Sequence, residues 1–310
     1  MYRIGIDLGG TNIAVGVVNE AYQITAQHSV PTGASRPSDA VIGDMIGAVE
    51  NVLHKAGLSI SDCASIGIGA PGTCDSLRGE VVRAYNLQWF HVPVCELLHQ
   101  YFAIPVRLSN DANCAALAES VAGAGRGCRN LVLITLGTGV GGGIILDGKI
   151  QAGMRSAGAE LGHILLVLDG EPCTCGRRGC WEAYASATAL IRQTIQAGKG
   201  HPESLLAQIP AENVTGRTVF DAADRGDLTA QKVIDRYCVY IAAGFTDLVN
   251  ALAPEMILLG GGISRQGERI LQPIRDYVAD HCFGQHEGAI PVIVAAQLGS
   301  EAGIIGAAAL

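Results

Sequence analysis

The sequence lacks any long hydrophobic run. Glycine or polar residues interrupt its apolar stretches well before the roughly 18 residues that a membrane-spanning helix needs. The first residues, Tyr2 to Asp7, also lack the extended apolar core and the small-residue cleavage site of a secretory signal. We therefore expect a cytoplasmic protein with no membrane partner.

Charged residues are few, and clusters of basic residues are absent. Only 16% of the 310 residues are charged, and the formal net charge is -8. Affinity for nucleic acid depends on clustered Lys and Arg side chains that contact phosphates. We therefore expect no nucleic-acid partner.

A regular disulfide framework is also missing. The ten cysteines are irregularly spaced in a large chain, and Cys173, Cys175 and Cys180 fall within one short segment. The remaining thiols are scattered, as in proteins of a reducing compartment.

The sequence does contain a repeated pattern of apolar strands around glycine-rich turns. The chain is long enough for two ordinary domains, each with its own core. The residues from Tyr2 to Asn19 and from Leu131 to Asp147 each predict a β-hairpin with a Gly/Thr turn. A helical pattern and an apolar strand follow in each half, at Ser38 to Ala56 and Ser65 to Gly69, and at Leu228 to Leu252 and Met256 to Leu259. This alternation predicts an α/β fold.

A short strand and a helix are expected to connect the two halves. The strand is predicted at Pro105 to Asn110 and the helix from Asn113 to about Ala122, and we place a hinge there. The residues from Pro202 to Arg225 are polar and interrupted by proline and glycine, which we interpret as a surface segment of the second domain.

The two glycine-rich turns suggest phosphate binding. Without side chains, backbone N–H groups can approach an oxyanion closely, and a threonine hydroxyl adds a donor. The predicted clamps are Gly9, Gly10, Thr11 and Asn12 in the first turn, and Gly137, Thr138 and Gly139 in the second. Asp7 precedes the first turn, where a carboxylate could hold Mg²⁺ or its water shell. One such turn alone would favour the interpretation as an ordinary hairpin, with Asp7 as a turn residue. Because the turn occurs twice, we favour phosphate binding.

A third glycine cluster, Gly260 to Gly262, follows the strand predicted at Met256 to Leu259. It precedes a helical stretch from Gln266 to Ala279. Bare backbone at a strand end and a helix start suits contact with a nucleotide. The cluster does not follow the G-x-G-x-x-G pattern and is a weak signal by itself.

Four soft metal ligands lie between Glu160 and Glu182. They are His163, Cys173, Cys175 and Cys180. Cys3His is a standard ligand set for zinc, and four protein ligands leave no open position, so the zinc would be structural. The alternative is a loop with three free thiols and a nearby core histidine. A structural zinc does not by itself explain why the carboxylates of Glu160 and Glu182 flank the loop.

Polar residues end the strand predicted at Pro105 to Asn110, and ligands often bind at such strand ends in α/β sheets. The carboxylate of Asp111 could take a proton from a hydroxyl group that Asn110 orients. Equally, Ser109, Asn110 or Asp111 could simply cap the helix that follows. Gly72 and Asn86 could complete a polar pocket, although each alone is more often a turn residue.

Seven motifs in this order resemble the ROK family of sugar kinases and repressors, within the actin-like ATPase superfamily. They are Asp7-Leu-Gly-Gly-Thr-Asn12, Gly69-Ala-Pro-Gly72, Asn110-Asp-Ala-Asn113, Thr135-Leu-Gly-Thr-Gly139, Glu160-Leu-Gly-His163, Cys173-x-Cys-Gly-x-x-Gly-Cys180-x-Glu182 and Leu259-Gly-Gly-Gly262. The resemblance covers essentially the whole chain and implies a two-domain, ribonuclease H-like fold with a cleft between the domains. The implied small domain takes residues 1–109 with the C-terminal helix 299–310, and the large domain takes residues 110–298, with a zinc loop at 163–180.

The resemblance is closest to the bacterial glucokinase branch. It implies ATP-dependent phosphorylation of a hexose at its 6-hydroxyl, with Mg²⁺ and a structural Zn²⁺. The substrate we expect is glucose, converted to glucose 6-phosphate. Asp111 matches the catalytic base. The implied sugar contacts are Gly72, Asn86, Asn110, Asp111, Glu160, His163 and Glu182. The implied nucleotide and magnesium contacts are Asp7, Gly9, Gly10, Thr11, Asn12, Gly137, Thr138, Gly139, Gly260, Gly261 and Gly262.

Other members of the family leave alternatives open. The repressor branch carries a helix-turn-helix before its first strand, whereas here Met1 is followed at once by the predicted strand, so we do not expect a repressor. A kinase for N-acetylmannosamine, N-acetylglucosamine or allose, or a non-catalytic sugar-binding regulator, would share the motifs. The resemblance also implies a homodimer.

Overall fold

The computed structural model describes residues 1–310, apart from the side chains of Gln285 and Glu287. The chain forms two compact units, each assembled from separate segments. Unit 1 contains Met1–Leu133, Gly143–Ala159 and Ala296–Leu310, and unit 2 contains Ile134–Gly142 and Glu160–Ala295.

Unit 1 contains a five-stranded sheet in the order β3-β2-β1-β4-β8. Its strands are β1 (Tyr2–Leu8), β2 (Asn12–Val18), β3 (Ile24–Pro31), β4 (Cys63–Ala70) and β8 (Val106–Asn110). The first three strands pair antiparallel, and β4 pairs parallel with both β1 and β8. The first predicted hairpin is therefore confirmed.

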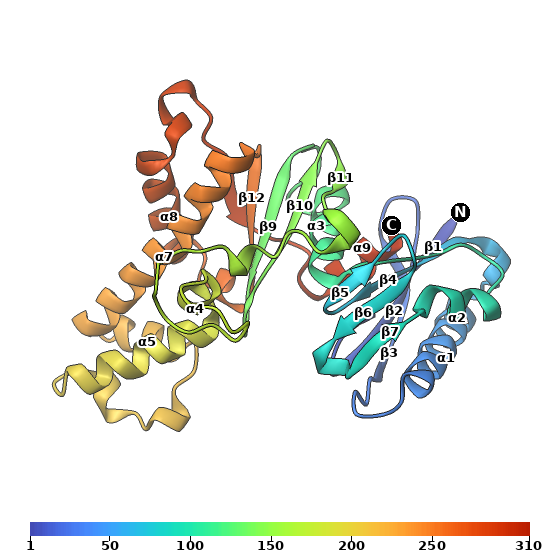
Figure 1. The fold of residues 1–310 in the computed structure, drawn as a ribbon, viewed down its shortest axis with the longest axis horizontal. Helices are drawn as coiled ribbons and strands as arrows, with labels where there is room; N and C mark the ends of the chain where they lie inside the picture. Colours follow the sequence, from blue (N-terminus) through green and yellow to red (C-terminus); the bar gives the residue numbers. More distant parts are fainter. The chain divides into compact units, whose positions relative to one another are not determined.

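Alternate side chains of β1 cover one face of this sheet. Ile4, Ile6 and Leu8 are fully buried in one core with residues of α1 (Ser38–Ala56) and α2 (Val94–Tyr101). The two helices lie side by side on that face (Figure 1). The bounds of α1 are those of the predicted amphipathic run.

The opposite face carries α9 (Ala302–Ala308) at very close range. A Cβ atom on Gly5 would lie 1.9 Å from the carbonyl oxygen of Ile304, and one on Gly67 would lie 1.7 Å from that of Ala307. Only glycine permits this approach. Helix α9 also packs against α3 (Asp111–Val121), so unit 1 extends beyond residue 109. The predicted division into a small domain, 1–109 with 299–310, and a large domain, 110–298, stays a prediction.

A small sheet that the sequence analysis did not predict follows β4. It has the order β5-β6-β7, with β5 (Thr73–Asp75), β6 (Glu80–Ala84) and β7 (Trp89–Val92). Its pairs are antiparallel. Asn86 lies in the 3-10 turn Tyr85–Leu87 that joins β6 to β7.

The second five-stranded sheet has the order β11-β10-β9-β12-β13. Its strands are β9 (Leu131–Leu136), β10 (Val140–Leu146), β11 (Lys149–Ile150), β12 (Met256–Gly261) and β13 (Val292–Ala295). β10 and β11 pair antiparallel, and β12 and β13 pair parallel. β9 and β10 are neighbours joined by the Gly137–Gly139 turn, as the second hairpin pattern predicts.

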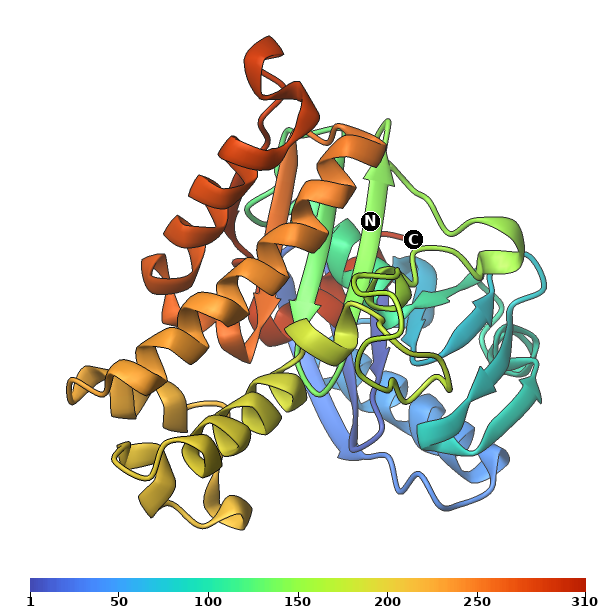
Figure 2. The same cartoon turned by 60° about the vertical axis from the view of Figure 1, so that its left-hand side comes forward.

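The helices of unit 2 are α4 (Glu182–Ala185), α5 (Ala187–Gly200), α6 (Thr218–Asp224), α7 (Leu228–Leu252) and α8 (Glu268–His281). α7 and α8 lie side by side (Figure 2), and α7 has its predicted bounds. Trp181 is fully buried against Gly244 of α7, and its Nε1 donates a hydrogen bond to the carbonyl of Tyr240 at 2.8 Å.

Two expectations about the connecting segments need correction. The helix predicted from Asn113 begins at Asp111, because the side chain of Asn110 caps it. The residues from Pro202 to Arg225 are not all on the surface, because α6 buries Val219 and Phe220.

None of the helices in the described part of the chain combines the length and the apolar character that a membrane span requires. All ten cysteines are free thiols.

Candidate functional site

The first glycine-rich turn joins β1 to β2. The N–H of Gly9 donates to the carbonyl of Asn12 at 2.9 Å, and the hydroxyl of Thr32 donates to the carbonyl of Gly9 at 2.7 Å. Thr11 and Asn12 are exposed. The turn is therefore a fixed backbone loop whose predicted phosphate contacts are accessible to a ligand.

Asp7 and Asp111 form a pair of carboxylates in unit 1. Burial raises the pKa of Asp7 to about 6, and the charge of Asp111 adds to the rise. Asp7 packs against α9, where a Cβ on Gly303 would lie 2.3 Å from its Oδ2. A carboxylate whose ionised form is disfavoured by burial and by a neighbouring carboxylate suits a divalent cation, which offsets the negative charge.

The predicted sugar contacts of unit 1 lie around the end of β8. Asn110 caps α3 by accepting from the N–H of Ala112 at 2.9 Å, and its Nδ2 donates to the carbonyl of Gly72 at 3.0 Å. The capping role that the sequence left open is therefore present. Asp111, the first residue of α3, has an exposed side chain whose Oδ1 accepts from the same N–H at 2.8 Å.

Asn86 lies against the first glycine-rich turn. A Cβ on Gly10 would be 3.2 Å from its Nδ2, which is tight but not a severe overlap. The structure therefore brings Asn86 to the predicted phosphate turn, whereas Asn110 lies beside Gly72.

The second glycine-rich turn borders a cavity of about 610 Å³ in unit 2. Gly137 and Thr138 line it together with Gly262 from the third glycine cluster. Gly260 and Gly261 end β12, and Gly261 has a φ of +84°, with only 2.2 Å between the position of a Cβ and the carbonyl oxygen of Leu136. Two predicted nucleotide-binding segments therefore meet at one cavity.

Sequence reasoning missed several residues of this cavity. Its other walls include Ala187, Gly216, Arg217, Phe220, Asp221, Asp224, Ile263, Arg265 and Gln266. Phe220, Asp221 and Asp224 belong to α6, within the segment that the sequence predicts to lie on the surface. The apolar pair Val219 and Phe220, with Ala222 and Ala223 after Asp221, was the available signal for a packed helix there.

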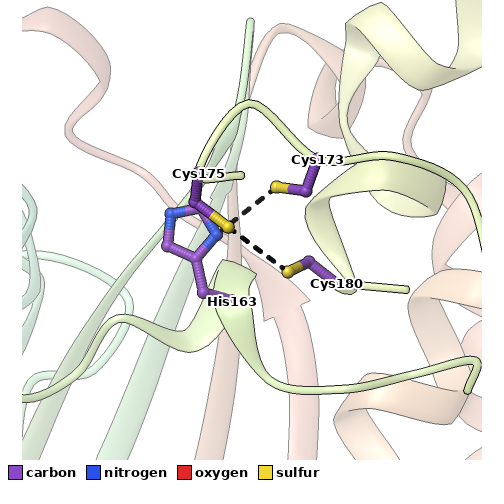
Figure 3. Close-up of side chains that lie close together, drawn as sticks. All are labelled: His163, Cys173, Cys175 and Cys180. Carbon is purple, nitrogen blue, oxygen red and sulfur yellow. Dashed lines mark hydrogen bonds between the residues drawn. The ribbon is translucent and has the colours of Figure 1, made fainter. Parts of the chain in front are cut away.

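The four predicted metal ligands converge in unit 2 (Figure 3). Their ligand atoms all lie within 4.8 Å of one another, with 3.6 Å between Sγ of Cys175 and Sγ of Cys180 and 3.7 Å between Sγ of Cys173 and Nδ1 of His163. Ligand atoms in a tetrahedron with Zn–S bonds of about 2.3 Å lie roughly 3.8 Å apart. The donor set and its spacing therefore fit a tetrahedral zinc ion.

The two flanking carboxylates have different surroundings. Glu160 is exposed, and its carbonyl accepts from the N–H of His163 at 3.0 Å. Glu182 begins α4, and its Oε2 accepts from the N–H of Val140 at 3.0 Å. Glu182 thus contacts the strand that follows the second glycine-rich turn, a contact that the sequence did not predict.

A profile of the ROK family matches residues 3–310. The chain belongs to the ROK family. The resemblance inferred from the motifs is therefore confirmed.

Several relatives cover nearly the whole chain. The glucokinase of Halalkalibacterium halodurans is 36% identical over 98% of this chain and 93% of the relative. The glucokinase of Streptomyces coelicolor is 38% identical over 99% of this chain and 96% of the relative. The crystal structure of a ROK family glucokinase from Streptomyces griseus, in complex with glucose and AMPPNP, is 37% identical with a TM-score of 0.80, and the match covers 100% of this chain and 98% of that one. The similarity confirms the predicted fold class, the α/β fold of the actin-like ATPases.

Proposed function

We propose that the protein transfers the γ-phosphate of ATP to the 6-hydroxyl of a hexose, with glucose as the preferred substrate. The observation that carries the proposal is the full-length similarity to glucokinases, one of them solved with glucose and an ATP analogue. The order of all the site motifs along the chain supports the same activity.

The nucleotide is proposed to bind at the cavity of unit 2. There the N–H groups of Thr138 and Gly139 are proposed to donate to phosphate oxygens, while the N–H of Gly137 holds the turn by donating to the carbonyl of Gly139 at 3.0 Å. Gly262 lines the same cavity as Gly137 and Thr138. The first turn, Gly9 to Asn12, is proposed to bind phosphate through its own backbone and the hydroxyl of Thr11. Phosphoryl transfer depends mainly on the alignment of the reacting groups and on neutralisation of the phosphate charge.

Asp7 is proposed as the carboxylate on the magnesium side. A protonated Asp7 would be a poor ligand for a cation, so magnesium should displace its proton and lower its pKa. Mg²⁺, when bound, neutralises charge on the phosphates.

Asp111 is proposed as the general base. Its carboxylate is exposed at the first turn of α3, where the helix dipole and the N–H of Ala112 favour the ionised form. It therefore acts by position more than by basicity, accepting the proton of the 6-hydroxyl as that oxygen attacks phosphorus. Gly72, Asn86, Asn110, Glu160, His163 and Glu182 are the proposed contacts for the rest of the sugar.

His163, Cys173, Cys175 and Cys180 are proposed to hold a structural zinc. When bound, the ion cross-links the loop and supplies no catalysis, since four protein ligands close its coordination sphere. Nδ1 of His163 faces the thiols, which leaves Nε2 for a sugar hydroxyl. Residues 1–109 with 299–310 are proposed as the small domain, and a cytoplasmic homodimer as the working form.

The test is an assay of ADP release with a panel of sugars, which includes glucose, allose, N-acetylglucosamine and N-acetylmannosamine. We expect the highest kcat/KM with glucose. A higher value with another sugar would reassign the substrate. Binding of sugars without turnover of any of them would replace the kinase with a non-catalytic regulator.

A further inference from the structure

The second glycine-rich turn is tied to the residues that follow the metal loop, residues 163–180. Three hydrogen bonds connect residues 182–188 with the Gly137–Gly139 turn and with Val140, the residue after it. They connect Val140 N to Glu182 Oε2 at 3.0 Å, Ala187 N to Gly137 O at 2.9 Å, and Thr188 Oγ1 to Thr138 O at 2.8 Å. The turn therefore takes its position from α4 and the start of α5.

The carboxylate of Glu182 also reaches back to the metal loop. The hydroxyl of Thr174, which lies between two of the metal ligands in sequence, donates to Oε1 at 3.2 Å, while Oε2 faces Val140. Gly139 leaves room for this group, because a Cβ there would lie 2.3 Å from Oε2. One carboxylate thus bridges the loop and the turn.

We propose that Glu182, Thr188 and Thr174 are positioning residues for nucleotide binding, and that the metal loop and the nucleotide site are coupled through them. The inference rests on the proposed function only in taking the Gly137–Gly139 turn as a phosphate site. Backbone N–H groups bind phosphate well only when they are held in the right direction, so loosening the turn weakens the nucleotide. The metal would then support ATP binding as well as sugar binding.

The first test compares threonine variants of the same helix. Thr188→Val removes the hydroxyl that holds the turn, and Thr188→Ser keeps it. Thr194→Val is the matched control, because the Thr194 hydroxyl donates to the carbonyl of Leu190 within α5 at 2.8 Å. We expect Thr188→Val to weaken Mg-ADP about three- to tenfold in calorimetry, the range for one lost hydrogen bond, with glucose binding unchanged. Thr188→Ser and Thr194→Val should bind like the wild type.

The second test addresses the metal loop. Zinc is removed with a chelator, the protein is desalted, and Mg-ADP binding is measured again. We expect weaker nucleotide binding after zinc removal, and a similar loss in zinc-loaded Thr174→Val but not in Thr174→Ser. These measurements hold even if Thr188→Val does not fold.

The outcomes separate this inference from the proposed function. Equal Mg-ADP affinity in Thr188→Val and Thr194→Val, or in zinc-loaded and zinc-free protein, would overturn the coupling. The expected pattern of affinities in a protein that phosphorylates no sugar would support the coupling and overturn the kinase. A wild-type protein that binds no nucleotide would overturn both.

Discussion

At the scale of single residues, the two carboxylates for which we propose different roles lie in different surroundings. Asp7 is largely shielded by α9 and has a raised pKa, whereas Asp111 lies exposed at a helix start. A buried carboxylate is a good place for a cation, and an exposed one can meet a substrate hydroxyl. The difference comes from their surroundings and not from their chemistry.

Replacing Asp111 with Asn should remove the general base. We expect Asp111→Asn to lower kcat by about two to four orders of magnitude, the usual scale for this loss, while glucose binding changes little. Steady-state kinetics and glucose titration measure the two effects. Asp39→Asn, on the exposed start of α1, is the control. Near-normal turnover of Asp111→Asn would refute the assignment.

The raised pKa of Asp7 predicts a dependence of stability on pH. The folded chain holds this proton up to about pH 6, whereas the unfolded chain releases it near the ordinary pKa of 3.8. In metal-free protein, Asp7 should therefore lower the free energy of unfolding as pH rises from 4 to 6, with no further change above. Asp7→Asn should remove this slope and gain on the order of 2 kcal/mol at pH 7 over the wild type. Urea unfolding at pH 4.5 and 7 checks the difference, and equal slopes in both proteins would contradict it.

At the scale of elements, long patterns were predictable and short ones were not. α1 and α7 have their predicted bounds, because a long amphipathic pattern fixes a helix. The strand β5, with three residues, depends on its partner and carries no pattern of its own. Glycines such as Gly67 were visible in the sequence, but their contact with α9 required the structure.

The candidate site was predictable to a similar degree. The candidate metal ligands and the glycine turns stood out because their residue types recur at close spacing along the chain. Phe220 and Thr188 did not, since they reach the cavity of unit 2 or the Gly137–Gly139 turn only through the packing of α6 and α5. Spacing along a chain reveals local chemistry, and tertiary contacts remain hidden.

Helix α9 supplies a prediction about packing. Gly67→Ala would place a methyl group 1.7 Å from the backbone oxygen of Ala307, so we expect a loss of about 2–4 kcal/mol in the free energy of unfolding. Gly47→Ala in α1 is the matched control, since, apart from the neighbouring backbone of α1 itself, nothing lies within 4 Å of its Cβ position. That change should stabilise the helix by up to about 1 kcal/mol. Chemical denaturation measures the free energy of unfolding of both variants. Equal values for Gly67→Ala and Gly47→Ala would contradict the close contact between Gly67 and α9.

The metal loop supplies a second prediction at this scale. Cys175→Ser should release the zinc, lower the melting temperature and weaken sugar binding, because the loop carries His163 and is followed by Glu182. Metal analysis and thermal melting measure the effects, with Cys95→Ser as a control outside the cluster. Unchanged melting and sugar affinity in metal-free Cys175→Ser would exclude a structural zinc.

At the scale of the whole molecule, we predict a homodimer. Sedimentation equilibrium of the purified protein should give twice the mass of the chain. Since most homo-oligomers are closed and symmetric, a single self-complementary surface on each protomer should be enough to form the dimer interface. A single species at the monomer mass over the whole accessible concentration range would contradict the prediction.

The placement of α9 also bears on how the chain is made. Unit 1 needs the segment Ala296–Leu310, which leaves the ribosome only after the whole of unit 2 has been synthesised. Until then, the glycine-lined face of the first sheet has no helix to cover it. Synthesis therefore supplies the last residue of unit 2 before the last segment of unit 1, so unit 2 can complete its core before unit 1 does.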